Sequence, residues 1–437
     1  MKPFHYLAGI SALAFSTAAY ADVTVNITGA TAFRAATLLS IKSKYVASGV
    51  AFKFAHDQAT AGGTTFSGAT RAIFTGSFPG VAGTTTIRCC FTGSLEGIQS
   101  LVPVVDPVPP TYYQLSLLNS TNAVIGGAEL AAQGTTGAAT AVSDIAFSDV
   151  AKSSTPFAGF PLLPSAPAAG VIVFTMLTNE GSAITDVTSQ QFRALLSAGT
   201  QPLSLFTGNA ADSSSVFATG RNDGSGTRTI YLAESGYGIS NPVKQYVTTV
   251  STTSALSTIQ LVPAGGLNSP ALPGQSAANA STIWGQNIAG NGGYNSGSAL
   301  RTDMGKTGAA VTVLDETGAD INGGPVRADL VTWLSLNDAV TARNNGAVLC
   351  SYNGVKLNDI ATAGTVLSAA DKAKVTNGKY TAWSYENMYR RSSLTGGDAV
   401  TVYDGIKAAI PANLGSAGIA LADMAVGREL DGGTVAP

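Results

Sequence analysis

Between residues 218 and 232 the chain reads ATGRNDGSGTRTIYL, a segment whose residue types suit an anion. Arg221 stands shortly before Ser225, Gly226 and Thr227, and a helix-like run follows. The first turn of a helix has unpaired N–H groups and a partial positive charge, and both favour an anion. An arginine adds a bidentate, charge-assisted pair. The spacing therefore predicts that backbone amides, hydroxyls and one guanidinium converge on a small anion.

Three other segments share this design, in which a strand ends in a turn rich in Gly, Ser, Thr or Asp. They are ITGATAFRAA at 27–36, FTGSLEGIQSL at 91–101 and DIAFSDV at 144–150. In open α/β sheets, ligands bind beyond the carboxyl ends of the strands. Thr31, Ser94, Ser225 and Thr227 each supply a hydroxyl near a helix start. Any one of them alone is more simply an N-cap, which contributes about 0.5–2 kcal/mol, but the four together favour a shared site.

Histidine is too scarce for the common hydrolytic sites. Beyond the expected signal peptide the chain has only His56, which lies beside Asp57. A Ser-His-Asp triad would have to use it, and a histidine-based zinc site would have too few ligands. We expect His56 to be a surface residue. We accordingly expect no catalytic residue, no metal and no cofactor.

The three cysteines are compatible with two alternatives. Cys350 can form a disulfide with Cys89 or Cys90, as exported proteins often do, which leaves one odd thiol. Alternatively, all three are buried and unpaired. No Cys-x-x-Cys motif is present, which also disfavours a metal site.

The first 21 residues indicate export. Lys2 precedes an apolar run at 7–18, and AYA at 19–21 has the small-x-small form of a cleavage site. We expect a signal peptide at 1–21, cleaved after Ala21, and a mature protein that is periplasmic or secreted. The apolar run is shorter than the ~20 residues of a membrane span. No other stretch approaches that length, so we expect no span in the mature chain.

The composition argues against a nucleic-acid partner. Charged residues make up 11% of the 437 residues, the formal net charge is -2, and no basic run occurs. Binding to phosphate backbones requires clustered Lys and Arg. Because 45% of the residues are hydrophobic, the chain can build a substantial core. Its length suits two or three domains or lobes.

Strand-like and helix-like segments alternate along the chain, which predicts an α/β protein. Strands are expected at 22–30, 84–94, 140–150, 169–179 and 213–221, and helices at 31–46, 189–199 and 227–236. The segment 329–346 also predicts a helix, and the aromatic segment 379–391 is expected to run into one. Residues 47–86, rich in Gly, Thr, Ser and Ala, have the composition of an insertion.

These motifs together resemble the substrate-binding proteins of phosphate ABC transporters, the PstS type, within the type 2 periplasmic-binding-protein superfamily. The nearest match is RNDGSGT, Arg221 to Thr227. The resemblance implies that Arg221, Ser225, Gly226 and Thr227 bind inorganic phosphate. It implies that Asp223 pairs with Arg221 as a second-shell residue. Arg228 is an additional cation, and on a helix that begins near Ser225 we expect it to face solvent.

The other segments resemble the remaining phosphate-binding loops of that family. TGATAF implies Thr31 and the N–H of Ala32, TGSLEGIQ implies Ser94, and FSDV implies Asp149. Asp149 would be the selectivity element, since a carboxylate can only accept a hydrogen bond. Hydrogen phosphate carries the proton that this requires, whereas sulfate lacks it and would be repelled.

The resemblance further implies a two-lobed type 2 periplasmic binding protein fold, with mainly parallel sheets and a two-strand hinge. Lobe 1 would contain 22–165 and 298–437, and lobe 2 would contain 166–297. Phosphate would bridge the lobes and favour hinge closure. An ABC permease is the partner that this function implies. Two alternatives are a secreted or surface structural protein that reuses the fold without transport, and a phosphoester hydrolase.

Overall fold

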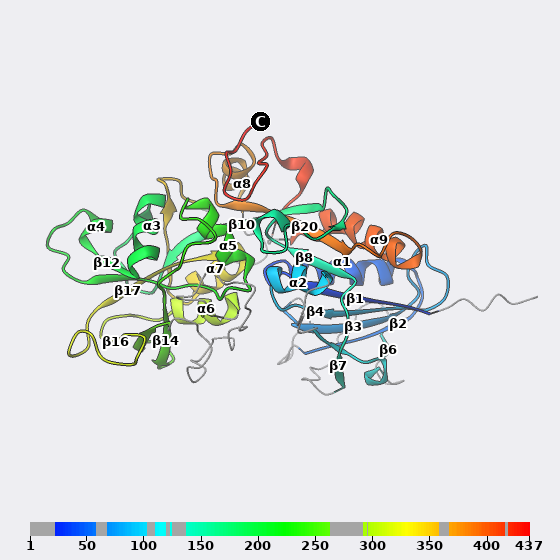
Figure 1. The fold of residues 1–437 in the computed structure, drawn as a ribbon, viewed down its shortest axis with the longest axis horizontal. Coiled ribbons are helices and arrows are strands. Elements are labelled where there is room, and N and C mark those ends of the chain that lie inside the picture. The colour runs from blue at the N-terminus through cyan, green and yellow to red at the C-terminus, as the bar shows by residue number, and fades with distance from the viewer. Residues whose placement is uncertain are drawn as a thin grey trace, which may run out of the picture.

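One continuous sheet connects two lobes, which lie side by side in Figure 1. The computed structural model describes residues 22–57, 68–102, 110–118, 123–124, 137–262, 292–294, 296–357, 367–415 and 418–437. Within these ranges the sheet has fourteen strands in the order β12-β13-β17-β10-β20-β8-β1-β4-β3-β2-β6, with β18 and β21 on β10 and β9 on β20. The expected signal peptide, 1–21, lies outside the described residues.

Lobe 1 is a sheet with helices on both faces. Its elements are β1 (Val23–Gly29), α1 (Arg34–Ala47), β2 (Phe52–His56), β3 (Arg71–Gly76), β4 (Thr85–Cys90), α2 (Ser94–Leu101), β6 (Ala123–Val124), β8 (Ile145–Ser148) and α9 (Asp398–Asn413). Ile145 and Phe147 of β8 join the core formed with α1 and α9, whereas Ala146 joins the cluster that contains α2. This alternation follows from the two-residue period of a strand.

Lobe 2 combines the other end of the long sheet with a small three-stranded sheet. Its elements are α3 (Ser189–Ala198), β12 (Thr200–Pro202), α4 (Ser204–Thr207), β13 (Ser215–Ala218), α5 (Gly226–Glu234), β14 (Tyr246–Ser251), β15 (Leu256–Leu261), α6 (Gly297–Met304), β16 (Thr312–Leu314), β17 (Ala328–Ser335) and α7 (Leu336–Asn344). Thr188 and Gln191 form a capping box at the start of α3, and Gly199 ends that helix with φ +83°.

The two lobes share the strand β10 (Ala168–Thr178). Residues 171–173 of β10 pair with β20 (Trp383–Arg391), and residues 174–178 pair with β17. From Ala169 onward β10 is buried throughout, which explains its continuous apolar sequence. Since β20 also pairs with β8 of lobe 1, β10 and β20 connect the two lobes.

Short elements complete the described part of the chain. They are β5 (Thr111–Tyr113), β7 (Ala138–Thr140), β9 (Leu162–Leu163), β11 (Asp186–Val187), β18 (Val348–Leu349), β19 (Ser351–Tyr352), α8 (Ala369–Thr376), β21 (Gly418–Ile419) and 3-10 turns at Leu115–Leu117, Lys152–Ser154 and Leu421–Asp423.

The α/β class and most expected elements are confirmed, but the sheet is mixed rather than mainly parallel. β1 pairs in parallel with β4 and β8, and β13 pairs in parallel with β17. The crossing strands β10 and β20 pair antiparallel with their neighbours. Residues 47–86 contribute the antiparallel strands β2 and β3, which extend the edge of lobe 1 beyond β4.

Three expectations about later segments are wrong. The first half of 329–346 is the strand β17, whose eight residues are all buried, so it shows no one-sided pattern. Residues 383–391 form strand β20 instead of leading into a helix. The lobe boundary near 298 also differs, because α6, β16, β17 and α7 pack into the core of lobe 2.

The environments of His56 and the cysteines are now defined. His56 is fully buried at the end of β2, where it stacks on Phe54 with ring centroids 6.1 Å apart, so the expected surface histidine is wrong. In the sheet, His56 pairs with Ala72 of β3. Cys89, Cys90 and Cys350 are all free and buried, which agrees with the second of the two alternatives.

Gly29 is a steric requirement for the pairing of β1 with β8. It has φ +114°, and a Cβ there would overlap the Phe147 carbonyl. We expect Gly29→Ala to lower the midpoint of thermal unfolding much further than Gly49→Ala, where φ is +68° and the surrounding space is open. Gly49→Ala is the control, because it adds only the strain of an alanine in the left-handed region, about 1–2 kcal/mol. Calorimetry on both variants measures the difference, and equal shifts would contradict this packing.

Candidate functional site

Arg221 is held rigidly just after β13. Its backbone forms an isolated parallel bridge with Tyr294, and its Nε donates to the Tyr294 carbonyl at 2.9 Å. Gln245 donates from Nε2 to the Arg221 carbonyl at 3.1 Å. The residue is only 2% exposed. Burying a guanidinium is costly unless charges and acceptors surround it, so this placement has to be explained by its neighbours.

Helix α5 begins at Gly226, as the sequence predicts. Ser225 occupies the N-cap position, but its side chain makes no capping hydrogen bond. Ser225 and Thr227 are 2% and 3% exposed, respectively. The N-cap positions of α1 and α2 are Phe33 and Gly93, again without a side-chain cap. None of the four predicted hydroxyls therefore caps its helix, and the simpler N-cap interpretation fails for each.

Ser94 and Asp149 meet in lobe 1. The Ser94 hydroxyl, in the first residue of α2, donates to Oδ1 of Asp149. Ser384 of β20 donates to the Asp149 carbonyl at 2.6 Å, which holds the backbone of Asp149 on the hinge strand. Burial raises the pKa of Asp149 to about 6, while the Ser94 hydrogen bond and the Arg221 charge act to lower it.

The two lobes meet at the N-termini of α2 and α5. The Leu95 N–H donates to the Gly224 carbonyl at 3.3 Å. A Cβ on Gly226 would overlap Oδ1 of Asp149, and a Cβ on Gly93 would come within 2.6 Å of the Gly224 carbonyl oxygen. Glycine at these positions permits the close approach. The Asp149 carboxylate thus lies between two helix N-termini from different lobes, which is the candidate site.

Arg221 is surrounded by carboxylates from both lobes. Burial lowers its pKa, and the charges of Asp338, Asp149 and Glu96 raise it. Glu96 lies in the first turn of α2, with its carboxylate against Gly224. Burial raises the pKa of Glu96 to about 7, the Thr92 hydrogen bond lowers it, and the Asp223 charge adds to the rise. The site therefore combines the buried Arg221 with several carboxylates, and burial raises the pKa of two of these, Asp149 and Glu96.

The predicted solvent exposure of Arg228 is wrong. Arg228 is 2% exposed and donates from Nη1 to the Arg221 carbonyl at 3.3 Å, so it does not face solvent. Burial raises the pKa of Asp223, and the Arg228 charge is the main influence that lowers it. The pairing of Asp223 with Arg221 stays a prediction. A first-turn side chain of α5 can point back over the preceding loop, which brings Arg228 inward.

Thr31 and Ala32 lie in the half-buried turn between β1 and α1. The Ala30 N–H donates to the Phe147 carbonyl at 2.8 Å, and the Gly93 N–H donates to the Gly29 carbonyl at 3.0 Å. These bonds connect the turn to β8 and to the start of α2. Contact of Thr31 or Ala32 with a ligand stays a prediction.

Sequence reasoning missed several acids and cations near the site. Glu96 and Arg34 stand inside the quoted loop motifs, so the motifs could have drawn attention to them. Asp338 accepts from Nη1 of Arg301 at 2.7 Å and lies in a segment that had no predicted role. Glu386 of β20 is fully buried, and neither of its carboxylate oxygens has a hydrogen-bond partner. Burial raises the pKa of Glu386 well above its usual range, and the Asp149 charge adds to this rise.

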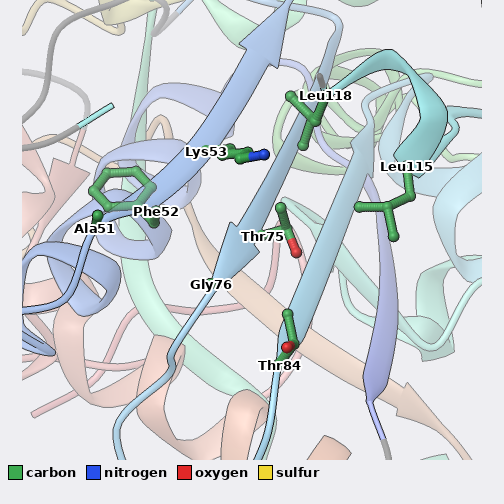
Figure 2. A pocket seen from close by; sticks show the side chains of 8 residues that line it. All are labelled: Ala51, Phe52, Lys53, Thr75, Gly76, Thr84, Leu115 and Leu118. Carbon is green, nitrogen blue, oxygen red and sulfur yellow. The ribbon is translucent and has the colours of Figure 1, made fainter. Parts of the chain in front are cut away.

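Two other possible sites offer no comparable chemistry. Within the described ranges, no group of three or more His, Cys, Asp or Glu residues is arranged to hold a metal ion. Figure 2 shows a groove on lobe 1, formed by β2, β3 and neighbouring loops. Its lining contains Phe52, Leu115 and Leu118, with Lys53 as the charged member, and includes none of the predicted anion-binding residues.

No helix among the described residues is long and apolar enough to cross a membrane.

The fold is similar to solved substrate-binding proteins of phosphate transport. One from Clostridium perfringens, assigned to phosphate ABC transport and solved with bound phosphate, is 12% identical with a TM-score of 0.43, over 91% of this chain and 99% of that one. An ABC-type phosphate transport receptor from Vibrio cholerae is 10% identical with a TM-score of 0.40, over 90% and 96%. PstS from Borrelia burgdorferi is 11% identical with a TM-score of 0.35, over 88% and 92%. No protein-family model and no curated protein sequence matches the chain.

The raised pKa of Glu96 predicts how stability depends on pH. The folded state binds the Glu96 proton more tightly than the unfolded state. The contribution of Glu96 to the free energy of unfolding therefore falls as pH rises from about 4.5 to about 7. We expect Glu96→Gln to unfold near the wild-type temperature at pH 4.5 and at a higher temperature at pH 8. Glu316→Gln, on an exposed loop of lobe 2, serves as the control. A Glu96→Gln effect that is the same at both pH values would contradict the burial of this carboxyl group.

Proposed function

We propose that this chain is a solute-binding protein that captures inorganic phosphate, or a similar tetrahedral oxyanion, between its lobes. One observation carries the proposal: the buried Arg221 and two helix N-termini from opposite lobes converge on one point, beside Asp149. Backbone N–H groups and uncapped hydroxyls at helix starts are suited to oxyanions. The resemblance of RNDGSGT to the phosphate loop of PstS-type proteins supports phosphate as the ligand.

Binding requires the lobes to separate first. Asp149 and Gly226 are in direct contact, so an anion between them needs additional space. The lobes can move about β10 and β20 and close again once the anion bridges Ser94 and Asp149 of lobe 1 to Arg221 and residues 225–227 of lobe 2. A ligand that contacts both lobes only when they are closed favours that state. Thr31 and Ala32 are proposed to complete the lobe 1 side.

We further propose export, uptake through an ABC permease, and binding without catalysis. The leader-like sequence at 1–21 supports export to the periplasm or the medium. His56 lies on β2, which is separated from β1 by β3 and β4 in the sheet, so it is poorly placed to act at this site. The Arg221 guanidinium and the N–H groups at the helix starts are donors, which suit binding of an anion.

The contact between the lobes also favours a second candidate, a secreted structural protein that keeps the fold without transport. In that case Asp149 itself would be the permanent anion at the start of α5, and its contact with Gly226 would be the final state. The two candidates differ in whether the lobes respond to phosphate. Binding of phosphate to the full chain therefore distinguishes them.

The test of the proposal is calorimetric titration of the full chain with phosphate. We expect saturable binding and expect Arg221→Ala to weaken it about thirtyfold or more, since loss of one partner of a buried charge pair costs about 2–5 kcal/mol. Arg327→Ala, which removes a half-exposed arginine from the same lobe, should bind as wild type does. Circular dichroism confirms that each variant is folded. Absence of phosphate binding by the wild-type chain would support the structural candidate instead.

Asp149 should control discrimination between phosphate and sulfate. We expect Asp149→Asn to gain affinity for sulfate, because the amide can donate to an unprotonated oxygen where the carboxylate cannot. Phosphate affinity should fall or stay level, so the ratio of the two affinities shifts toward sulfate. Competition titrations at pH 8 measure that ratio, at a pH where the carboxylate is ionised. If the mutant rejects sulfate as strongly as wild type does, Asp149 is not the selectivity residue.

A further inference from the structure

The last residues of the chain form a closed loop between the lobes. Gly427 and Ala436 exchange two backbone hydrogen bonds, of 2.7 and 3.0 Å, which define residues 427–436 as the C-terminal loop. Figure 1 shows the C-terminus at the top of the molecule, above the junction of the lobes and near α8. Val426 and Val435, at the base of the loop, pack against the core cluster that contains β10.

The C-terminal loop is anchored to the far end of α5 in lobe 2. Nη1 of Arg428 pairs with Oε2 of Glu234 at 2.8 Å, and both side chains are almost fully buried. Gly432 lies directly on the backbone of Ala233, where a Cβ would overlap the chain. Because α5 is a single rigid helix, these contacts also restrain Gly226 at its other end.

The same loop is anchored to lobe 1 and to the hinge. Oδ2 of Asp431 accepts from the Ala151 N–H at 2.8 Å, and Ser154 also bonds to this carboxylate. Ala151 is two residues after Asp149, so this bond holds the segment that carries the site carboxylate. Nη2 of Arg428 donates to the Thr381 carbonyl at 2.7 Å, and its guanidinium lies 4.2 Å from the Trp383 ring centroid, at the start of β20.

We propose that the C-terminal loop is a clamp that sets the distance between the lobes, by holding the Asp149 segment and α5 at the same time. Its anchors belong to three parts that change their relative positions when lobes move about a hinge. Opening of the site must therefore break the Asp431 anchor or the Arg428 and Gly432 anchors. The clamp positions Asp149 against the start of α5, and this role does not depend on which anion binds.

The experiment measures the distance between the lobes in the full chain without phosphate. Spin labels are placed at Val46→Cys on α1 and Leu205→Cys on α4, which are 48% and 57% exposed, while the native cysteines are buried. Gly432→Ala tests the clamp because it keeps every charge and pushes the loop off α5. Gly354→Ala is the matched control: its φ of +75° is close to the +68° of Gly432, and the space around it is open.

We expect pulsed electron paramagnetic resonance to show a shift to longer distances in Gly432→Ala and none in Gly354→Ala. Asp431→Ala, which removes the lobe 1 anchor, should produce a shift in the same direction. A role confined to overall stability would lower the unfolding temperature without changing the distance. Wild-type distance distributions in both Gly432→Ala and Asp431→Ala would overturn the proposal. The outcome of a phosphate titration does not enter this test, so it can fail independently of the proposed function.

Discussion

The burial of Asp149 between two helix N-termini is the constraint on which the arrangement of the lobes depends. Removing a carboxylate from water is costly unless hydrogen bonds and opposite charges replace the solvent. Here Ser94 comes from lobe 1, whereas Arg221 and the start of α5 come from lobe 2. Because the compensating groups lie on both sides, the charge is stabilised only when the lobes are close. Glycine at 226 follows directly, since any side chain would displace the carboxylate.

Under the proposed function, the long sheet lets the distance between the lobes change while they stay connected. β10 pairs with β20 along one part and with β17 along the next, so the backbone hydrogen bonds continue from one lobe into the other. Bending at this junction can change the distance between α2 and α5 while each lobe keeps its own core. The C-terminal loop spans the same junction through Arg428 and Asp431. The proposed hinge, the candidate site and the proposed clamp would therefore all act on one distance, that between Asp149 and Gly226.

Several acids surround Arg221, with Arg34 and Arg228 as further cations nearby. Arg221 is influenced by Asp338, Asp149 and Glu96, and burial raises the pKa of the last two. Protonation of Asp149 or Glu96 would lower the local negative charge and so favour an anion. A ligand that carries its own proton can serve the same purpose, which is consistent with hydrogen phosphate as the proposed ligand.

Local patterns predicted the elements whose structure is determined by nearby residues. The start of α5 at Gly226, the capped helix α3 and the apolar strand β10 all follow from turn chemistry, capping and continuous apolarity. β17 was mistaken for a helix because it is buried on both faces, and that burial depends on β10 and β13. Its sequence therefore lacks the alternation by which a half-exposed strand is identified.

The sequence by itself determined which residue types stand at the strand ends: the RNDGSGT motif, Ser94 at the start of its helix and Asp149 after its strand. Hydrogen-bonding capacity and helix starts are local properties, so they can be read from neighbouring residues. Only the tertiary structure decided that Arg228 is buried and that Glu96 lies against Gly224. Burial and charge interactions depend on segments far apart in the chain, because solvent is excluded only after those segments pack together.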